Sequence, residues 1–160
     1  MAIKVGDTIP SVKLKYMNDK GMQEISTDDL FKAKKVVVFA LPGAFTPTCS
    51  AKHLPGYVQN ADAIKAKGVD TIACIAVNDA FVMNAWGKDQ NADGKVMMLA
   101  DGNGDFTRAV GLELDATGFG MGKRSQRYAM VVVNGKVTKL AVEPGPGLDA
   151  SAAEKIMAQL

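Results

Sequence analysis

Short apolar runs, separated by polar and glycine-containing segments, dominate the chain. Alternation across Val12–Tyr16 indicates a half-buried strand, and Met22–Glu24, after the turn at Asp19–Gly21, indicates its antiparallel partner. Continuous apolar runs are typical of strands covered on both faces. Three such runs are present: Val36–Leu41, Asp70–Val77 and Lys95–Ala100.

Helical segments are predicted between these strands. Ser26–Phe31 has the composition of a short capped turn, and Asn78-Asp79 is placed to cap the next helix. The other predicted helices are Cys49–Lys67, kinked at Leu54–Gly56 and closed by Gly68, Ala80 to about Gln90, Phe106–Val110 and Ser151–Leu160.

The last strands form a hairpin, and the segment before them is predicted to be a loop. Asn134-Gly135 joins Tyr128–Val133 to Lys136–Val142, and this dipeptide supplies the positive φ angles of a type I′ turn. The glycine-rich segment Ala116–Gly122 is expected to be a flexible loop. Strands with crossover helices and a terminal hairpin predict an α/β domain with a mixed sheet, formed by residues 1–160 as a single domain.

Composition and charge exclude several kinds of partner. The formal net charge of the 160 residues is +2 and the basic residues are scattered, so we expect neither nucleic acid nor a membrane surface as a partner. No apolar run has the roughly 20 residues of a membrane span. The start, Met1–Asp7, lacks the pattern of a signal peptide, which predicts a cytoplasmic protein or the mature form of an organellar precursor.

One cysteine lies where an α/β sheet usually binds ligands. Cys49 follows a buried strand and the loop from Pro42 to Thr48, at the predicted start of a helix. Unpaired N–H groups and the helix dipole favour a thiolate there, so Cys49 is a candidate nucleophile. Thr46 can present its hydroxyl to the sulfur or to an oxygen bound beside it. The alternative is that Cys49 is simply a small buried apolar residue.

The surrounding sequence favours the first interpretation. Pro42-xxx-Thr46-xx-Cys49 matches the Pro-x-x-x-Thr/Ser-x-x-Cys signature of the peroxiredoxins, and the run Pro-Gly-Ala-Phe-Thr-Pro-Thr-Cys-Ser resembles the peroxiredoxin 5, or type II, subfamily. The resemblance extends over nearly the whole chain, including Ala76–Asp79 and Arg124–Val131. It implies a thioredoxin-like fold with an N-terminal hairpin extension.

The resemblance also implies a reaction and a site. Cys49 would reduce hydrogen peroxide and alkyl hydroperoxides through a sulfenic acid, and Arg127 would stabilise the thiolate and polarise the peroxide. Pro42, Gly43 and Phe45 would line the substrate site, with Phe45 and Phe119 forming an apolar collar around it. A homodimer is implied, and no metal, haem, flavin or nicotinamide cofactor. Without the motif, Arg127 would be interpreted as a surface ion pair.

Two other functions remain as alternatives. His53 lies four residues after Cys49, and a Cys-His pair would suggest a hydrolase or acyl transferase. Replacing His53 with Gln separates the two, because a peroxidase should largely keep its activity. A redox sensor that uses Cys49 oxidation as a signal, without efficient turnover, is the second alternative.

The route by which Cys49 is reduced depends on Cys74 and on the C-terminal segment. Cys74 could resolve the sulfenic acid by forming an internal disulfide, as is proposed for some type II members. It lies in an apolar strand, however, where a thiol is usually a core side chain and cannot travel far without local unfolding. Some peroxiredoxin 5 enzymes carry a further resolving cysteine after a Gly-Leu step, but this chain has Gly147–Ser151 without a cysteine. An external thiol is therefore expected, with glutathione and glutaredoxin ahead of thioredoxin.

Overall fold

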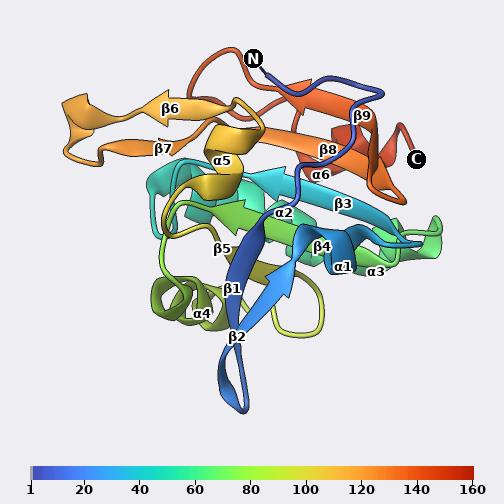
Figure 1. Ribbon diagram of the computed structural model, residues 1–160, viewed down its shortest axis with the longest axis horizontal. Coiled ribbons are helices and arrows are strands. Elements are labelled where there is room, and N and C mark those ends of the chain that lie inside the picture. Colours follow the sequence, from blue (N-terminus) through green and yellow to red (C-terminus); the bar gives the residue numbers. More distant parts are fainter. Residues whose placement is uncertain (1) are drawn as a thin grey trace.

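The computed structural model describes residues 2–160 and places one central mixed sheet beside a small two-stranded hairpin (Figure 1). The sheet has the strand order β2-β1-β5-β4-β3-β8-β9, in which β3, β4 and β5 are parallel and the other pairs antiparallel. Its strands are β1 (Lys13–Asn18), β2 (Gly21–Ser26), β3 (Lys35–Ala40), β4 (Thr71–Ala76), β5 (Met97–Ala100), β8 (Tyr128–Val133) and β9 (Lys136–Val142). The small hairpin pairs β6 (Glu113–Asp115) with β7 (Lys123–Ser125).

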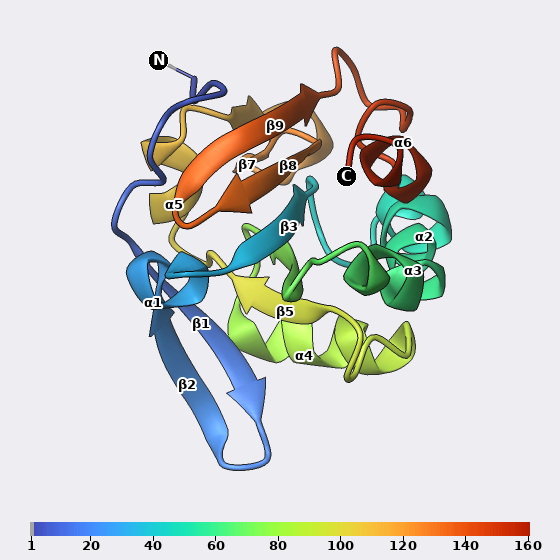
Figure 2. The same cartoon turned by 90° about the vertical axis from the view of Figure 1, so that its right-hand side faces the viewer.

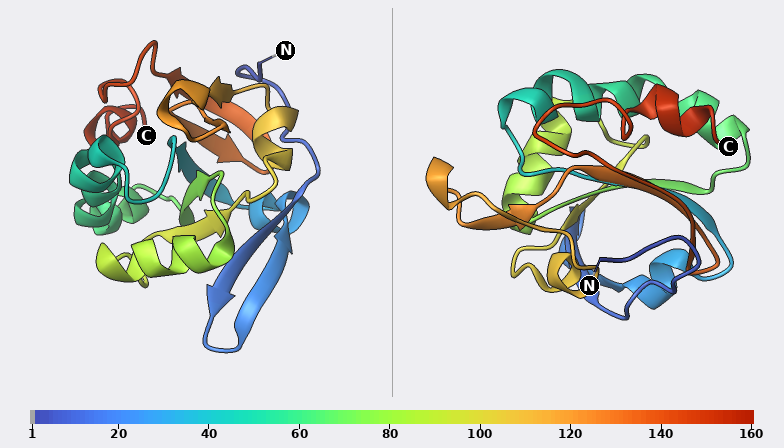
Figure 3. Two further views of the ribbon diagram at one scale, coloured as in Figure 1. Left: turned by 90° about the vertical axis from the view of Figure 1, so that its left-hand side faces the viewer. Right: turned by 90° about the horizontal axis from the view of Figure 1, so that it is seen from above.

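Helices cover both faces of the sheet. One face carries α2 (Leu54–Gln59), α3 (Ala61–Ala66), α4 (Ala80–Asp89) and α6 (Ala153–Met157), and the other carries α1 (Thr27–Phe31) and α5 (Asp105–Ala109) (Figure 3). A π-helical turn, η1 (Cys49–His53), leads into α2, and a 3₁₀ turn, η2 (Thr117–Phe119), lies between β6 and β7. Among residues 2–160, no helix has the length and apolar character needed to span a bilayer.

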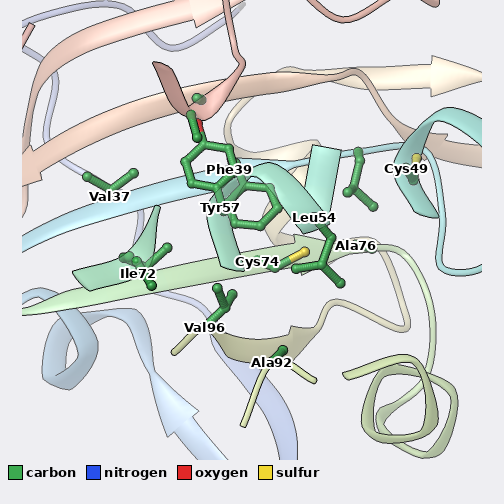
Figure 4. Packing of buried hydrophobic residues seen from close by; sticks show 14 of the residues in the cluster. Val37, Phe39, Cys49, Leu54, Tyr57, Ile72, Cys74, Ala76, Ala92 and Val96 are labelled. Carbon is green, nitrogen blue, oxygen red and sulfur yellow. The ribbon is translucent and has the colours of Figure 1, made fainter. Parts of the chain in front are cut away.

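Alternate residues of β3 pack into different cores, because successive side chains of a strand point to opposite faces. Val37 and Phe39 belong to the core beneath α2, α3, α4 and α6, whereas Val38 packs with the core beneath α1 and α5. In the first core, the rings of Phe39 and Tyr57 stack with centroids 4.0 Å apart (Figure 4). Phe39 therefore holds α2 against the strand that leads into the Cys49 loop.

Most predicted elements are confirmed, including the mixed sheet, the N-terminal hairpin and the Asn134-Gly135 turn, where both residues have positive φ. The hairpin of β1 and β2 extends away from the body of the molecule and meets β5 only at Lys15 and Ala100 (Figure 2). The predicted helix over Cys49–Lys67 is divided. Its interruption at Leu54–Gly56 corresponds to the change from η1 to α2, and a second break at Asn60 was not predicted.

Two predictions about the later segments are wrong in extent. Ala116–Gly122 is not only a loop, because it contains η2 and is flanked by the short strands β6 and β7. The C-terminal helix is limited to Ala153–Met157 instead of Ser151–Leu160, since Ser151 and Ala152 belong to the connection from β9.

Candidate active site

The pairing of β3 with β8 brings two distant parts of the sequence together. Ala40, the last residue of β3, pairs with Tyr128, the first residue of β8. The loop that begins at Leu41 and ends at Cys49 therefore starts beside Arg127, which immediately precedes β8. The end of β4 lies at the same edge, because β3 and β4 are parallel. Ligands usually bind at the carboxyl ends of such strands.

Arg127 contacts the candidate nucleophile directly. Its Nη2 donates a hydrogen bond to Cys49 Sγ at 3.2 Å. Cys49 is fully buried and Arg127 is buried around it. A guanidinium at that distance attracts negative charge on the buried sulfur, because opposite charges interact strongly away from water. The geometry thus joins the two side chains that the resemblance implied.

His53 forms a hydrogen bond with the Arg127 guanidinium. Arg127 Nη1 lies 2.8 Å from His53 Nδ1, and His53 Nε2 lies 3.2 Å from the carbonyl oxygen of Ser151. Since a guanidinium can only donate, Nδ1 is the acceptor and Nε2 carries the hydrogen. Burial, and then the charge of Arg127, lower the pKa of His53 from 6.5 to about 3, with a smaller opposing effect from the Ser151 carbonyl. His53 is therefore a neutral acceptor for Arg127.

The π-helical turn sets the spacing of Cys49 and His53. The N–H of Leu54 donates to the carbonyl of Cys49, five residues earlier, instead of to the usual fourth residue. Pro55 follows at the start of α2 and has no N–H to continue a regular ladder. Cys49 and His53 thereby both reach Arg127, although His53 makes no hydrogen bond to the sulfur among the described contacts.

Gly43 allows a second arginine to support the loop. Arg124 Nη1 donates to the carbonyl of Pro42 at 3.3 Å, and a Cβ on residue 43 would lie only 2.7 Å from that nitrogen. The amide oxygen of Asn78 accepts from the N–H of Ala44 at 2.9 Å. Pro42 and Gly43 are thus fixed parts of the loop wall, and their contact with substrate stays a prediction.

Thr46 is held within the loop. Its hydroxyl donates to the carbonyl of Gly43 at 2.7 Å, and its own carbonyl accepts from the N–H of Ser50. The hydroxyl hydrogen is therefore used inside the loop, which leaves the lone pairs of the oxygen to accept a hydrogen bond. Of the two partners expected for the Thr46 hydroxyl, the sulfur is not among its hydrogen-bond partners within residues 2–160, and an oxygen bound beside the sulfur stays a prediction.

Phe45 and Phe119 are both on the surface. Phe45 is 54% exposed, has a positive φ of 63° and lies with its ring centroid 6.4 Å from that of Trp86. Phe119 is 86% exposed in the turn between β6 and β7. An apolar collar formed by both rings stays a prediction.

Cys74 lies in β4 with strands on both sides. It pairs with Phe39 of β3 and Met98 of β5, and it is fully buried (Figure 4). Burial, followed by the proximity of Cys49, raises the pKa of the Cys74 thiol well above its usual value, and Arg127 opposes this only in part. Both cysteines are free thiols.

Sequence reasoning missed three residues that shape the site. His53 was considered only as a hydrolase partner, and Arg124 and Asn78 were not singled out. The sequence did carry a signal for the last two, since both lie in runs that carry the family resemblance. Nothing local indicates that their side chains contact the loop, because each contact joins residues at least 34 positions apart.

Comparisons with known proteins identify the family of the chain. The family model described as Redoxin matches residues 4–157. Peroxiredoxin-2C of Oryza sativa subsp. japonica is 46% identical over 159 residues, covering 99% of this chain and 98% of the relative. Peroxiredoxin-2E, chloroplastic, of Arabidopsis thaliana is 45% identical and covers 99% of this chain and 70% of the relative.

A solved structure shows the same fold. The reduced Prx3 of Vibrio vulnificus, in complex with hydrogen peroxide, has a TM-score of 0.95 and 55% identity, with 98% of each chain covered. The fold and the site together define a thiol peroxidase of the thioredoxin-like class. The chain belongs to the redoxin family, and within it to the type II peroxiredoxins. Peroxiredoxins reduce peroxides at the expense of a thiol.

The expectation of a cytoplasmic protein is wrong by the same comparisons. Peroxiredoxin-2E of Arabidopsis thaliana is named chloroplastic, as is Peroxiredoxin-2E-2 of Oryza sativa subsp. japonica, which is 45% identical over 163 residues and 72% covered. Both names place these relatives in the chloroplast, which contradicts the expectation. The absence of a signal-peptide pattern, on which the expectation was based, does not distinguish the two locations.

Proposed function

We propose that this chain, as a single domain over residues 1–160, reduces hydrogen peroxide and alkyl hydroperoxides through a sulfenic acid on Cys49. The observation that carries the proposal is the hydrogen bond of 3.2 Å from Arg127 Nη2 to Cys49 Sγ. A buried guanidinium at that distance supports both a reactive thiolate and the negative charge that develops on the departing oxygen.

The first step transfers one oxygen to sulfur. The Cys49 thiolate attacks the nearer oxygen of the hydroperoxide, so that an S–O bond forms as the O–O bond breaks. The other oxygen leaves with the electron pair and takes a proton, which gives water or an alcohol. Sulfur is oxidised by two electrons and the peroxide is reduced by two.

Arg127 and Thr46 are proposed to hold the peroxide in line with the sulfur. Arg127 Nε is a buried donor without a partner among residues 2–160, so it is free to meet a peroxide oxygen. The Thr46 hydroxyl, which already donates to Gly43, would accept from the O–H of the peroxide. Catalysis then comes from positioning and electrostatics. Because Cys49 is fully buried, the side chains that cover it must move to admit peroxide.

The second step uses an external thiol, with glutathione and glutaredoxin favoured over thioredoxin. A thiol attacks the sulfenic acid and releases water, and a second thiol then reduces the mixed disulfide and restores Cys49. The buried position of Cys74 between two strands supports this one-cysteine cycle. A homodimer is proposed as well, supported by the family and by the exposed rings of Phe45 and Phe119.

The test compares two matched substitutions. Cys49→Ser should abolish peroxide consumption with glutathione and glutaredoxin, because the serine hydroxyl does not replace the thiolate. Cys74→Ser makes the same change at the other buried cysteine of the same core and should retain most of the rate. Peroxide loss is followed directly in solution. Peroxide consumption by Cys49→Ser at the parent rate would refute the proposal.

A further inference from the structure

The segment that joins β9 to α6 is fixed at its two ends and exposed between them. Pro144–Gly147 is exposed, whereas Glu143 is only 7% exposed and Ser151 is fully buried (Figure 2). One carboxylate oxygen of Glu143, Oε2, accepts from the N–H of Asp149 at 2.9 Å and from the N–H and hydroxyl of Ser151 at 2.8 and 2.6 Å. Glu143 therefore holds the far end of its own loop.

Ser151 connects Glu143 to the candidate active site by hydrogen bonds. Its carbonyl accepts from Tyr57 Oη at 2.7 Å and from His53 Nε2 at 3.2 Å. His53 Nδ1 then accepts from Arg127 Nη1 at 2.8 Å. The carbonyl of Arg127 accepts from the N–H of Glu143 at 2.9 Å. The hydrogen bonds thus form a closed circuit that begins and ends at Glu143 and includes the arginine beside Cys49.

The circuit places a negative charge near Arg127 without neutralising it. Burial raises the pKa of Glu143, but the hydrogen bonds from the Ser151 hydroxyl and from the N–H groups of Ser151, Asp149 and Ala150 lower it by more. Glu143 is therefore ionised at neutral pH. Neither Glu143 nor Arg127 forms a salt bridge within residues 2–160. Because two neutral groups separate them, the charge of Arg127 remains directed at Cys49.

We propose that Glu143 is a positioning residue for the peroxidase reaction, which holds Arg127 against Cys49 through Ser151 and His53. The carboxylate fixes the Ser151 carbonyl, and that carbonyl keeps the hydrogen of His53 on Nε2. Nδ1 is then left as the acceptor that orients the Arg127 guanidinium. The inference rests on the peroxidase function proposed above.

Three variants test the role by rate. Glu143→Ala removes the acceptor, and reduced enzyme mixed with hydrogen peroxide should be oxidised about tenfold more slowly, as expected for the loss of a hydrogen bond to a charged group. Glu143→Gln keeps one acceptor oxygen at the same place and should stay within about twofold of wild type. Glu154→Ala, the same change at an exposed position on α6, is the control. Trp86, whose Nε1 donates to Ser50 Oγ beside Cys49, reports oxidation by fluorescence.

The histidine provides a signal that general destabilisation would not change. His53 is the single histidine of the chain, so its ring nitrogens are unambiguous in NMR spectra. Wild type and Glu143→Gln should show hydrogen on Nε2 only, and Glu143→Ala should show a mixture of tautomers. In a His53→Ala background, Glu143→Ala should slow oxidation by less than about twofold, because coupled residues are not additive.

Clear results would overturn the role. A folded Glu143→Ala variant with the wild-type rate and tautomer would do so, as would an equal loss of rate in the His53→Ala background. If Glu143→Ala does not fold, Ser151→Ala removes one donor to the same oxygen, and a rate loss of roughly threefold that disappears in the His53→Ala background is expected. Wild-type behaviour of these variants would leave the peroxidase function standing, whereas that function fails only if Cys49→Ser stays active.

Discussion

His53 is a neutral side chain that the folded protein cannot easily protonate. Its pKa is lowered from 6.5 to about 3 by burial and by Arg127. The unfolded chain therefore binds a proton at this residue between pH 6.5 and 3, while the folded chain does not. A fall in pH stabilises whichever state binds more protons, which here is the unfolded state. The contribution of His53 to the free energy of unfolding is therefore complete above pH 6.5 and is lost progressively as the pH falls to 3.

His53→Gln should remove this dependence and keep the peroxidase. The glutamine oxygen can accept from Arg127, but the side chain does not titrate. Free energies of unfolding in urea should therefore show a wild-type curve steeper than the variant's by about 1.4 kcal/mol per pH unit below pH 6. The carboxylates titrate in both proteins, so their contributions to the free energy of unfolding cancel in the difference between the two curves. A constant difference between pH 7 and 4 would contradict the prediction, and loss of peroxide reduction would favour a Cys-His mechanism.

At the scale of elements, the start of α4 is fixed by a side-chain cap. Asp79 caps the helix by accepting from the N–H of Val82 at 2.8 Å, and the adjacent Asn78 holds the Cys49 loop at Ala44. Asp79→Ala should lower the free energy of unfolding by about 1 kcal/mol. Asp89→Ala makes the same change at the opposite end of α4, where a negative charge faces the unfavourable end of the helix dipole, and should not destabilise. Thermal unfolding of both variants checks this, and equal losses would rule out the cap.

Elements of this kind are predictable from sequence where a local pattern specifies them. The Asp79 cap, the Asn134-Gly135 turn and the apolar run of β3 each carry their signal within a few residues. The strands β6 and β7 do not, because each has only three residues and neither contains an apolar run. The π turn at Cys49 was also missed, since its sequence differs little from that of an ordinary helix.

At the scale of the whole molecule, the site depends on contacts that no local pattern encodes. Cys49 was identifiable from its place after a buried strand, and Arg127 from the family motif. The bond between them, however, exists because β3 pairs with β8. His53 gains its role in the same way, from a carbonyl at Ser151 that is 98 residues distant. Pairing of distant strands thus converts separate local signals into one site.

The same long-range packing bears on the proposed route by which the oxidised enzyme is restored. Cys74 lies in β4, which pairs with β3 on one side and with β5 on the other. Burial raises the pKa of its thiol. A disulfide requires Cα atoms within about 7 Å and suitable side-chain directions, so a bond between two buried thiols would require local opening of the core that contains both. Attack by an external thiol also requires the side chains that cover Cys49 to move, but it leaves the Cys74 thiol in place in the core.

Intact-mass analysis separates the two routes. Wild type and Cys74→Ser are each treated with one equivalent of hydrogen peroxide and then with glutathione. Both proteins should gain the mass of one glutathione, and peptide mapping should place it on Cys49. Loss of two hydrogens in wild type alone would instead show a bond between Cys49 and Cys74. In that case the core around the two thiols opens during turnover, and amide exchange in η1 or β4 should rise on oxidation.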